Sequence, residues 1–584
     1  MQVTSAVQAA ARDGAAIAER GGSFPLMLTA GTVAAASIAR SAAGALARGV
    51  DVFVGGGNNG GDGYVVAAQL ARLGVRVRVH VVVPPSSPDC TQAAAIARAR
   101  LPQQDIVPFV ADAPPPVVAG AVVVDAMLGM GGTGALRPAF AVAAACIDRA
   151  RRNGAVVVAL DVPTGVDATS GARAHGHVQA HVTLTFGTCK SGLLSARAAC
   201  GRVQVLDIGL GVHAQSFDGA PQLATAETLR VALPPIAWNA HKGTRGRVLL
   251  VGGTGGMAGA VQLAAQGALF SGAGLVRAAV HERSIAALQS SVPAVVTVPW
   301  GDDDDAVHAD LDETLAVSLT ETPASPLRSL REAASDWAHA VAIGPGLGRD
   351  ARASRLFARL LSHVSAGRAA LVLDADALVL LAERGLSPEF VSCAATRPVV
   401  ITPHAGEFAT LAQHFAVPFD HRASADPTAR LESARALARV LQCVVLLKGA
   451  PTMCVSPEGA AWFVARGSAA LATGGTGDLL TGVLASVLAA EQARTVMASA
   501  AMDSAGIAEA GMGSAGVEPN TSRTLAQVAL SAWVHGVAGE FGGATIRGRT
   551  VMDVIGQIPS AWARVAVPEA HAPGVLAELP ALEP

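Results

Sequence analysis

The sequence has few charged side chains, few aromatic side chains and almost no net charge. Only 15% of its 584 residues are charged, and 45 acidic against 43 basic side chains leave a formal net charge of -2. This balance gives no electrostatic attraction to nucleic acid or to an anionic membrane surface, and an aromatic content of 4% provides little surface for base stacking. We therefore expect no nucleic-acid partner and no membrane partner.

Long hydrophobic runs and paired cysteines are also missing. Although 51% of the residues are hydrophobic, charge, glycine or proline interrupts each run well before the roughly 20 residues that a membrane-spanning helix needs. The first residues lack the basic and apolar segments that are typical of a secretory signal. The seven cysteines form no CxxC pair, which favours small buried side chains in a reducing compartment. These absences predict a cytoplasmic protein.

The chain is too long for one hydrophobic core, and its composition is typical of an α/β protein. The 63 glycines, with many alanines and valines, suit tight turns between helices and buried parallel strands. A polar, weakly patterned stretch around residues 216–225 predicts a linker between two domains. We therefore expect a first domain over residues 1–215, a second domain over residues 226–565, and a loose tail over residues 566–584.

The most informative stretch is the glycine-rich segment Ala472–Asp478, which leads into one apolar helical face. The residues of that face recur at helical spacing: Leu480, Val483, Leu484, Val487 and Leu488. A glycine loop before a helix N-terminus directs backbone N–H groups at an anion, which predicts a phosphate cradle. Asp478 would repel phosphate as a ligand, so we interpret it as a base for a hydroxyl that attacks phosphorus. The alternative is a tight turn in which Asp478 only caps the helix.

In the first half, residues 50–54 form a predicted strand that runs into the glycine-rich segment Gly55–Gly63. The segment satisfies GxGxxG, but the next strand ends at Val83 without the acidic residue that a dinucleotide-binding fold uses for ribose. Asn58, Asn59 and Asp62 add oxygen atoms that suit a hard cation or substrate hydroxyls. The pattern therefore favours a ligand site other than the usual NAD fold.

Two further predicted strands end in a carboxylate and a polar loop. Asp125 precedes the glycine loop over residues 129–135, and Asp161 precedes the loop over residues 162–167. Because ligands bind at the carboxyl ends of parallel strands, we expect these loops to converge on one crevice.

Together with Thr185–Lys190, these motifs resemble the NAD(P)H-hydrate epimerase family, which implies a Rossmann-like three-layer α/β/α domain. The resemblance implies that K⁺ is held by Asn59, Asp125 and Thr164. It makes Asp161 the acid/base candidate. It also implies contacts to the substrate by Asn58, Asn59, Gly60, Gly61, Asp62, Gly129, Met130, Gly131, Gly132, Thr133, Gly134, Ala135 and Asp161.

In the second half, successive predicted strands end in glycine, aspartate, histidine and lysine. These ends lie in residues 342–348, 371–377, 399–407 and 444–452, and they describe an open α/β sheet with a site along one edge. With His241–Gly243 and Gly474–Asp478, they resemble the ribokinase-like superfamily and, within it, the ADP-dependent NAD(P)H-hydrate dehydratases. That resemblance implies contacts to the hydrate by Ala260, Gly346, His404 and Asp478. It implies contacts to the nucleotide by Lys448, Gly449, Ala450, Pro451, Thr452 and Gly477.

Both motif sets, in this order, resemble the bifunctional NAD(P)H-hydrate repair enzymes. The resemblance implies NADHX and NADPHX as substrates, K⁺ in the first domain, Mg²⁺ and ADP in the second, and a homo-oligomer. It implies epimerisation of the R and S hydrates, followed by dehydration of the S form with release of AMP and phosphate. ADP and ATP remain open as donors. The alternative is a ribokinase-like kinase of a small vitamin-precursor alcohol, fused to a non-catalytic binding domain.

Overall fold

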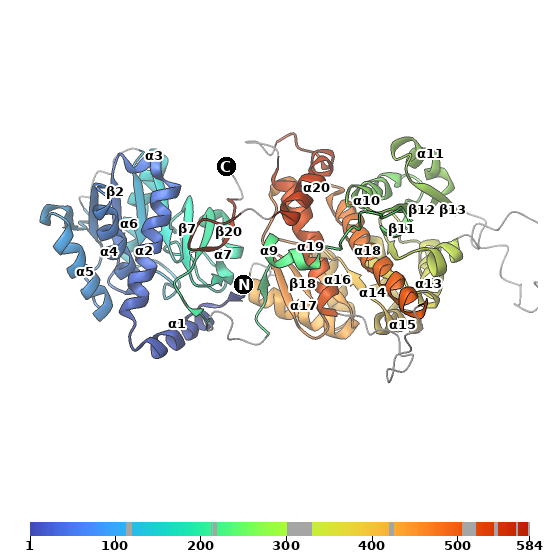
Figure 1. Cartoon of the computed structure of the whole chain (residues 1–584), viewed down its shortest axis with the longest axis horizontal. Coiled ribbons are helices and arrows are strands. Elements are labelled where there is room, and N and C mark those ends of the chain that lie inside the picture. The colour runs from blue at the N-terminus through green and yellow to red at the C-terminus, as the bar shows by residue number, and fades with distance from the viewer. Residues whose placement is uncertain are drawn as a thin grey trace, which may run out of the picture. The chain divides into compact units, whose positions relative to one another are not determined.

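The computed structural model describes residues 1–112, 120–211, 213, 219–300, 330–419, 426–504, 521–541, 547–567 and 570–581 (Figure 1). These residues divide into two compact units. Unit 1 contains the described residues of Met1–Leu223, Arg422–Arg430 and Glu569–Pro584, and unit 2 those of Ala224–His421 and Leu431–Pro568. The division at Leu223 lies inside the expected linker, part of which is outside the described residues.

Unit 1 is built on a sheet in the order β20-β9-β7-β6-β5-β2-β3-β4, in which every neighbouring pair except β20 with β9 is parallel. Its strands are β2 (Val50–Val54), β3 (Val77–Val81), β4 (Ile106–Pro108), β5 (Val122–Ala126), β6 (Val156–Leu160), β7 (Val182–Phe186), β9 (Arg202–Leu206) and β20 (Val575–Leu579). Short strands β1 (Val3–Thr4) and β8 (Cys189–Lys190) pair with each other, and β10 (Gln222–Leu223) ends this part of the chain. The helices are α1 (Ala6–Arg20), α2 (Phe24–Ser41), α3 (Ala43–Leu46), α4 (Asn58–Arg72), α5 (Pro88–Arg100), α6 (Pro138–Arg152), α7 (Ser191–Ser195) and α8 (Arg197–Cys200).

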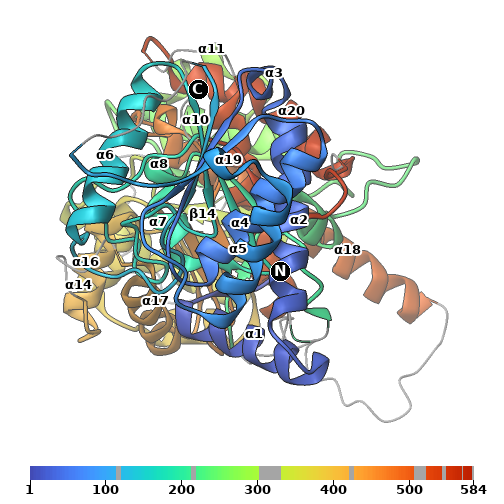
Figure 2. The same cartoon turned by 90° about the vertical axis from the view of Figure 1, so that its left-hand side faces the viewer.

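Alternate residues of these strands face two different cores. Val52 and Val124 pack with α2, α4 and α5, whereas Phe53 and Val123 pack with α6. Figure 2 shows α2, α4 and α5 on one side of the sheet and α6 on the other. Strands buried on both faces read as continuous apolar runs, which explains the valine-rich segments of the sequence. The expected three-layer α/β/α fold is confirmed.

The expectation of a loose C-terminal tail over residues 566–584 is wrong. Val575–Leu579 forms β20, which pairs antiparallel with β9, and the side chain of Gln204 donates a hydrogen bond of 2.7 Å to Glu578. Alternation of buried and exposed residues along β20 matches a strand with one face on a core. The alanines and prolines around this segment concealed a pairing that depends on residues far away in the sequence.

Unit 2 is built on a sheet in the order β19-β18-β17-β16-β15-β14-β11-β12-β13, parallel except for the antiparallel β18 and β19. Its strands are β11 (Arg247–Gly252), β12 (Leu275–His281), β13 (Val296–Trp300), β14 (Ala340–Ile343), β15 (Ala370–Leu373), β16 (Val399–Ile401), β17 (Val444–Leu447), β18 (Thr452–Val455) and β19 (Ala461–Val464). The helices are α9 (Ala226–Leu229), α10 (Ala258–Phe270), α11 (Glu282–Ser291), α13 (Ala351–Ala366), α14 (Asp376–Arg384), α15 (Pro388–Thr396), α16 (Ala405–His414), α17 (Pro427–Leu441), α18 (Thr476–Ser504), α19 (Thr521–Glu540) and α20 (Val551–Ala566).

One face of this sheet is covered by α10, α18, α19 and α20, which gather on it in Figure 1. The apolar residues predicted along α18 are buried: Leu480, Val483, Leu484, Val487 and Leu488. The helix is held at this face by apolar burial, and its N-terminus is thereby fixed at the carboxyl ends of the strands.

Among the described residues, no single helix is both long and apolar enough to cross a membrane, and the one helix pair that qualifies jointly, α1 with α2, is bent by 117°.

Candidate active sites

The strand order of unit 1 reverses between β2 and β5, and a cavity of about 590 Å³ opens at that point. Gly55 lets the two strand ends meet there, because a Cβ on it would lie 2.1 Å from the carbonyl oxygen of Met127. Helix α4 begins at Asn58 beside the cavity, so its first backbone N–H groups favour an anionic ligand. The loops after β2 and β5 and Asp161 after β6 meet at this crevice, as expected, whereas residues 162–167 are not part of its lining.

Several predicted substrate contacts line this cavity: Asn58, Asn59, Asp62, Gly129, Met130, Gly131, Gly132 and Asp161. Gly60 and Gly61 are buried behind it, and a Cβ on Gly61 would lie 2.5 Å from the sulfur of Met27. Thr133, Gly134 and Ala135 are exposed and do not belong to the lining. Their contact with substrate stays a prediction.

Asp161 is held in the cavity by a buried lysine. The Lys190 ammonium donates hydrogen bonds to Asp161 Oδ1 (2.7 Å), to Thr185 Oγ1 (3.1 Å) and to the carbonyl oxygen of Phe186 (2.9 Å). An ammonium group has three N–H donors, so Lys190 is fully occupied by these contacts. Asp161 has a backbone φ of 62°, a conformation that aspartate and asparagine tolerate better than most residues. The sequence motif contained Lys190, but nothing in it indicated this ion pair.

Two more carboxyl groups line the same cavity. Burial raises the pKa of Asp62 well above its usual range, and the charges of Asp161 and Asp13 raise it further. Burial also raises the pKa of Asp13 to about 6, an effect that the charge of Lys190 partly offsets. Asp13 lies on α1, whose alanine-rich sequence gave no sign of a site residue. The cavity thus combines one ion-paired carboxylate with two carboxyl groups that retain protons more readily.

Two of the three predicted K⁺ ligands, Asp125 and Thr164, are in direct contact. Asp125 is fully buried and accepts hydrogen bonds from the Thr164 hydroxyl (2.7 Å) and the Thr164 backbone N–H (2.8 Å). Both polar atoms of the Asn59 side-chain amide are buried and have no hydrogen-bond partner among the described residues. A buried amide oxygen without a donor is a ligand type that suits a hard cation, and a K⁺ site shared with Asp125 and Thr164 stays a prediction.

In unit 2, the predicted glycine loop ends at the first turn of α18. The Thr476 hydroxyl donates to the carbonyl oxygens of Leu471 (2.8 Å) and Thr473 (3.0 Å), which fixes the loop before the helix. Asp478 lies in the first helical turn, as predicted. Burial raises the pKa of Asp478 to about 7, the charge of Asp374 raises it as well, and Lys448 partly offsets both effects. A carboxyl group with this pKa suits proton transfer near neutral pH.

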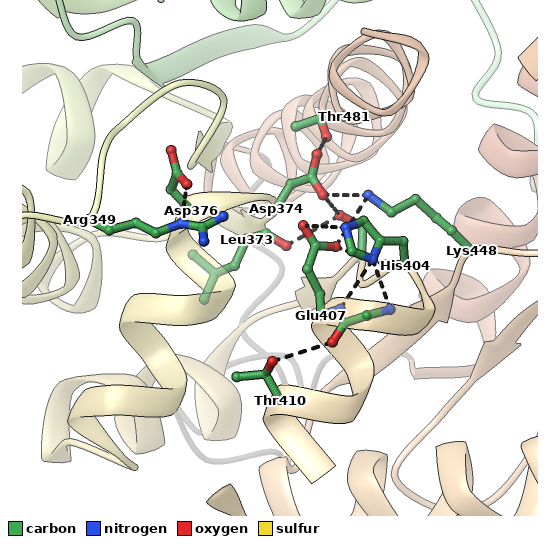
Figure 3. Close-up of polar contacts among 11 residues, drawn as sticks. Arg349, Leu373, Asp374, Asp376, His404, Glu407, Thr410, Lys448 and Thr481 are labelled. Atoms are coloured by element: carbon green, nitrogen blue, oxygen red, sulfur yellow. Dashed lines mark hydrogen bonds and ion pairs between the residues drawn. The ribbon is translucent and has the colours of Figure 1, made fainter. Parts of the chain in front are cut away.

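Asp374, at the end of β15, is the centre of the polar contacts in Figure 3. Its carboxylate accepts from the Thr402 hydroxyl (2.7 Å), the Thr481 hydroxyl (2.6 Å) and the Lys448 ammonium (2.8 Å). Burial would raise the pKa of Asp374, but Lys448 and the two hydroxyls hold it below the usual range. Sequence analysis placed this residue in a strand-end loop without giving it a role.

Lys448 has donor capacity left for a ligand. Besides the bond to Asp374, it makes a longer ion pair of 3.9 Å with Glu407, and its side chain is 20% exposed. Burial lowers its pKa, but the charges of Asp374 and Glu407 outweigh that effect and raise it overall. A Cβ on Gly477 would lie 3.5 Å from the Lys448 ammonium, so the lysine reaches the N-terminus of α18.

His404 is the N-cap of α16 and lies beside Glu407 and Lys448 in Figure 3. Its Nδ1 atom accepts from the backbone N–H groups of Gly406 (3.0 Å) and Glu407 (3.1 Å). The side chain is 60% exposed, and its Nε2 atom lies 3.4 Å from Glu407 Oε1. The imidazole therefore has a structural role, and its contact with substrate stays a prediction.

Of the remaining predicted residues of unit 2, Ala260 lies in the first turn of α10, and the others lie at strand ends. Gly346 has a φ of 62°, and a Cβ on it would lie 3.3 Å from the Cβ of Ala260, so these two residues adjoin each other. The turn between β17 and β18 is closed by the Thr452 hydroxyl, which donates to the carbonyl oxygen of Gly449 (2.9 Å). Ala450 and Pro451 form the centre of that turn.

Comparisons with known proteins assign both units. A family model described as NAD(P)H-hydrate dehydratase matches residues 248–531, and one described as YjeF-related protein N-terminus matches residues 23–192. The bifunctional NAD(P)H-hydrate repair enzyme Nnr of Moorella thermoacetica is 36% identical over 79% of this chain and 83% of its own. The enzyme of that name from Escherichia coli is 33% identical over 80% of each chain. A solved ADP/ATP-dependent NAD(P)H-hydrate dehydratase from Bacillus subtilis, co-crystallised with ATP and Mg²⁺, gives a TM-score of 0.43 and 25% identity, and the match covers 59% of this chain and 99% of that one.

Proposed function

This chain belongs to the family of bifunctional NAD(P)H-hydrate repair enzymes, and we propose that its two units perform the two reactions at the two sites described above. Unit 1 interconverts the R and S forms of NADHX and NADPHX. Unit 2 removes water from the S form and restores NADH or NADPH. The observation that carries this proposal is Asp478, a carboxyl group with a pKa of about 7 that lies beside a lysine at a helix N-terminus.

In unit 2, Asp478 takes the proton from the C6 hydroxyl of the hydrate. The hydroxyl oxygen forms a bond to the terminal phosphorus of the nucleotide, and the bond from that phosphorus to the nucleotide's bridging oxygen breaks. The C6–O bond then breaks, phosphate leaves with the electron pair, and loss of the C5 proton completes the C5=C6 double bond of NAD(P)H. Phosphate leaves far more easily than hydroxide, which is the reason for the transient transfer.

Lys448, with Gly449, Ala450, Pro451, Thr452 and Gly477, holds the nucleotide in this proposal. The ammonium and the first N–H groups of α18 stabilise negative charge on the transferred group. ADP is the proposed donor, with release of AMP and phosphate. The described residues contain no group of three acidic, histidine or cysteine side chains that could hold a metal, which fits an Mg²⁺ ion bound mainly by nucleotide phosphates. When bound, Mg²⁺ would neutralise phosphate charge.

In unit 1, Asp161 is the proposed acid/base residue of epimerisation, and the hydrogen bond from Lys190 holds its side chain in place. Asn59, Asp125 and Thr164 would hold K⁺, which would supply positive charge beside the substrate-binding loops. The unpartnered buried amide of Asn59 supports this assignment. Asn58, Asp62 and the loop from Gly129 to Gly132 would bind the cofactor hydrate.

A single assay tests the proposal. NADHX is incubated with the full chain and with ADP or ATP, and the return of NADH absorbance is followed together with release of free phosphate. We expect equimolar NADH and phosphate, and consumption of both epimers. A stable phosphomonoester without NADH would instead identify a small-molecule kinase and overturn the proposal.

A further inference from the structure

Asp374 connects the two functional groups of the unit 2 site. It is 1% exposed, and its carboxylate accepts hydrogen bonds from three different elements. Lys448 comes from the end of β17, Thr402 follows β16, and Thr481 lies on α18. A carboxylate with three donors at 2.6–2.8 Å, one of them an ammonium, is bound too fully to act as a base or a metal ligand itself.

The bond to Thr481 fixes the start of α18. Thr481 follows Asp478 by three residues, so both side chains lie on the same face of the first two helical turns. The Thr481 hydroxyl donates to Asp374 over 2.6 Å in a buried setting. Asp374 therefore holds, through Thr481, the helical turn that carries Asp478. It does so even though the two carboxylates repel each other.

The bond to Lys448 decides which carboxylate the lysine neutralises. Lys448 reaches the N-terminus of α18, and the charge of Asp478 acts on it there, as does that of Glu407 at 3.9 Å. An ion pair between Lys448 and Asp478 would stabilise the ionised carboxylate and weaken it as a base. Pairing Lys448 with Asp374 over 2.8 Å prevents this and leaves an unpaired base beside a cation that can meet phosphate.

We propose that Asp374 is a positioning residue of the dehydration reaction, which holds Lys448 for the phosphoryl group and keeps Asp478 free as the base. The proposal rests on the proposed function of unit 2. It deepens that function, because it names the residue that separates the base from the cation.

The charged groups around Asp478 give the proposal a directional test. Asp374, Asp376 and Glu407 surround it with negative charge, and Lys448 is the cation that acts on it. His535 of α19 is buried, and burial lowers its pKa to about 4, so this imidazole is neutral at the working pH. Removing the charge of Asp374 lowers the pKa of Asp478, whereas removing the charge of Lys448 raises it.

The experiment measures the pH profile of kcat/KM for dehydration by the full chain. For Asp374→Asn we expect the acidic limb of the kcat/KM profile, which reports the pKa of Asp478, to move to lower pH by about one unit. We also expect the plateau value of kcat/KM to fall at least 10-fold, because Asp478 becomes a weaker, lysine-paired base. For Lys448→Met we expect the acidic limb to move to higher pH, because the cation that lowers the pKa of Asp478 is lost. Thr402→Val is the matched control, since it removes one hydrogen bond to Asp374 without a change in charge, and its limb should stay in place.

Thr481→Val keeps the proposal testable if Asp374→Asn fails to fold. We expect the kcat of Thr481→Val to fall about 5-fold to 10-fold, because the start of α18 is no longer held firmly. Its KM for the nucleotide and the pH of its acidic limb should stay unchanged. A folded Asp374→Asn variant with an unmoved limb, or a Thr481→Val variant with normal kcat, would overturn the proposal. The Asp478→Asn variant distinguishes failure of the positioning role of Asp374 from failure of the proposed function. If that variant still dehydrates NADHX, the proposed function of Asp478 fails as well.

Discussion

Both units contain a buried aspartate paired with a lysine, but the two lysines are used differently. Lys190 in unit 1 has a side chain that is 2% exposed, and its three donors are all taken by oxygen atoms of the protein. Lys448 in unit 2 is 20% exposed and makes one short hydrogen bond, to Asp374. The first lysine can only hold its aspartate, whereas the second can also bind an anion.

The lysine-paired carboxylates, Asp161 and Asp374, differ in accessibility in the opposite way to their lysines. In unit 1 the lysine-paired Asp161 lines the cavity and can meet substrate. In unit 2 the lysine-paired Asp374 is enclosed by donors, and the proposed base is Asp478, which has no ion-pair partner within 4 Å among the described residues. In the proposed mechanism, the same kind of pair thus supplies the reacting carboxylate in unit 1 and the phosphate-binding cation in unit 2. The contrast fits the chemistry proposed for unit 2, because phosphoryl transfer needs positive charge next to the transferred group.

The largest effect should come from exchanging the two reactive carboxylates for amides. Asp478→Asn should lower dehydration by about 10²-fold to 10⁴-fold and leave epimerisation unchanged, and Asp161→Asn should do the reverse. Asparagine tolerates the φ of 62° at position 161, so that variant tests chemistry and not backbone strain. The two rates are measured separately, by chromatography of the R and S forms and by the return of NADH absorbance. Loss of both activities in either variant would contradict the division of labour.

The next largest effect should be a difference in the free energy of unfolding that is lost when each lysine is replaced by methionine. Lys190→Met leaves Asp161 buried with only the Thr185 hydroxyl at 3.2 Å, and we expect the free energy of unfolding of unit 1 to fall by about 3–5 kcal/mol. Lys448→Met leaves Asp374 with two hydroxyl donors, and we expect a loss of about 1–2 kcal/mol with a clear rise in nucleotide KM. Calorimetry of the full chain measures both losses. Equal losses would show that the lysines are not used differently.

The sequence predicted the parts of both sites that come from strand ends and glycine loops. Asp125, Asp161 and Asp478 each follow a recognisable local pattern, and a crevice between loops follows from a parallel sheet. Asp13 could not be found in this way, because it is one polar residue in an alanine-rich helix and only the packing of α1 brings it to the cavity. The strand β20 was missed for a similar reason, since its partner β9 lies more than 300 residues earlier.

The role of a side chain was harder to predict than its location. His404 was expected to contact substrate, and its Nδ1 atom proves to be occupied in capping α16. Asp374 had no predicted role, and its three donors come from other parts of the chain, two of them the hydroxyls of Thr402 and Thr481. Hydrogen-bond partners from distant parts of the chain decide whether a carboxylate is free to react, and no local pattern contains them.

A smaller effect concerns K⁺ and should be confined to unit 1. Asn59→Ala removes the buried amide that has no partner among the described residues, and we expect epimerisation to need about 10-fold more K⁺ for the same rate. Dehydration of pure S hydrate should respond to K⁺ as in the unaltered chain. Titration of each rate with KCl at constant ionic strength measures this. An unchanged K⁺ response of epimerisation in Asn59→Ala would remove Asn59 from the metal site.

The smallest effect tests whether the unpaired carboxyl groups, Asp13 in unit 1 and Asp478 in unit 2, are alike. The folded protein raises the pKa of Asp13 from 3.8 to about 6, so the stability that this group contributes is full below pH 3.8 and is lost as the pH rises through about 6. Asp13→Asn cannot lose a proton, and relative to the unaltered chain it should gain roughly 1 kcal/mol between pH 4 and pH 7. For Asp478, with a pKa of about 7, the gain should begin at the same pH but continue to grow to about one pH unit higher, and it should be larger. Urea unfolding at a series of pH values measures both gains. A loss of stability in Asp13→Asn at pH 7 would mean that the carboxylate of Asp13 is favourably bound in the unaltered chain. Unit 1 would then differ from unit 2 in this respect also.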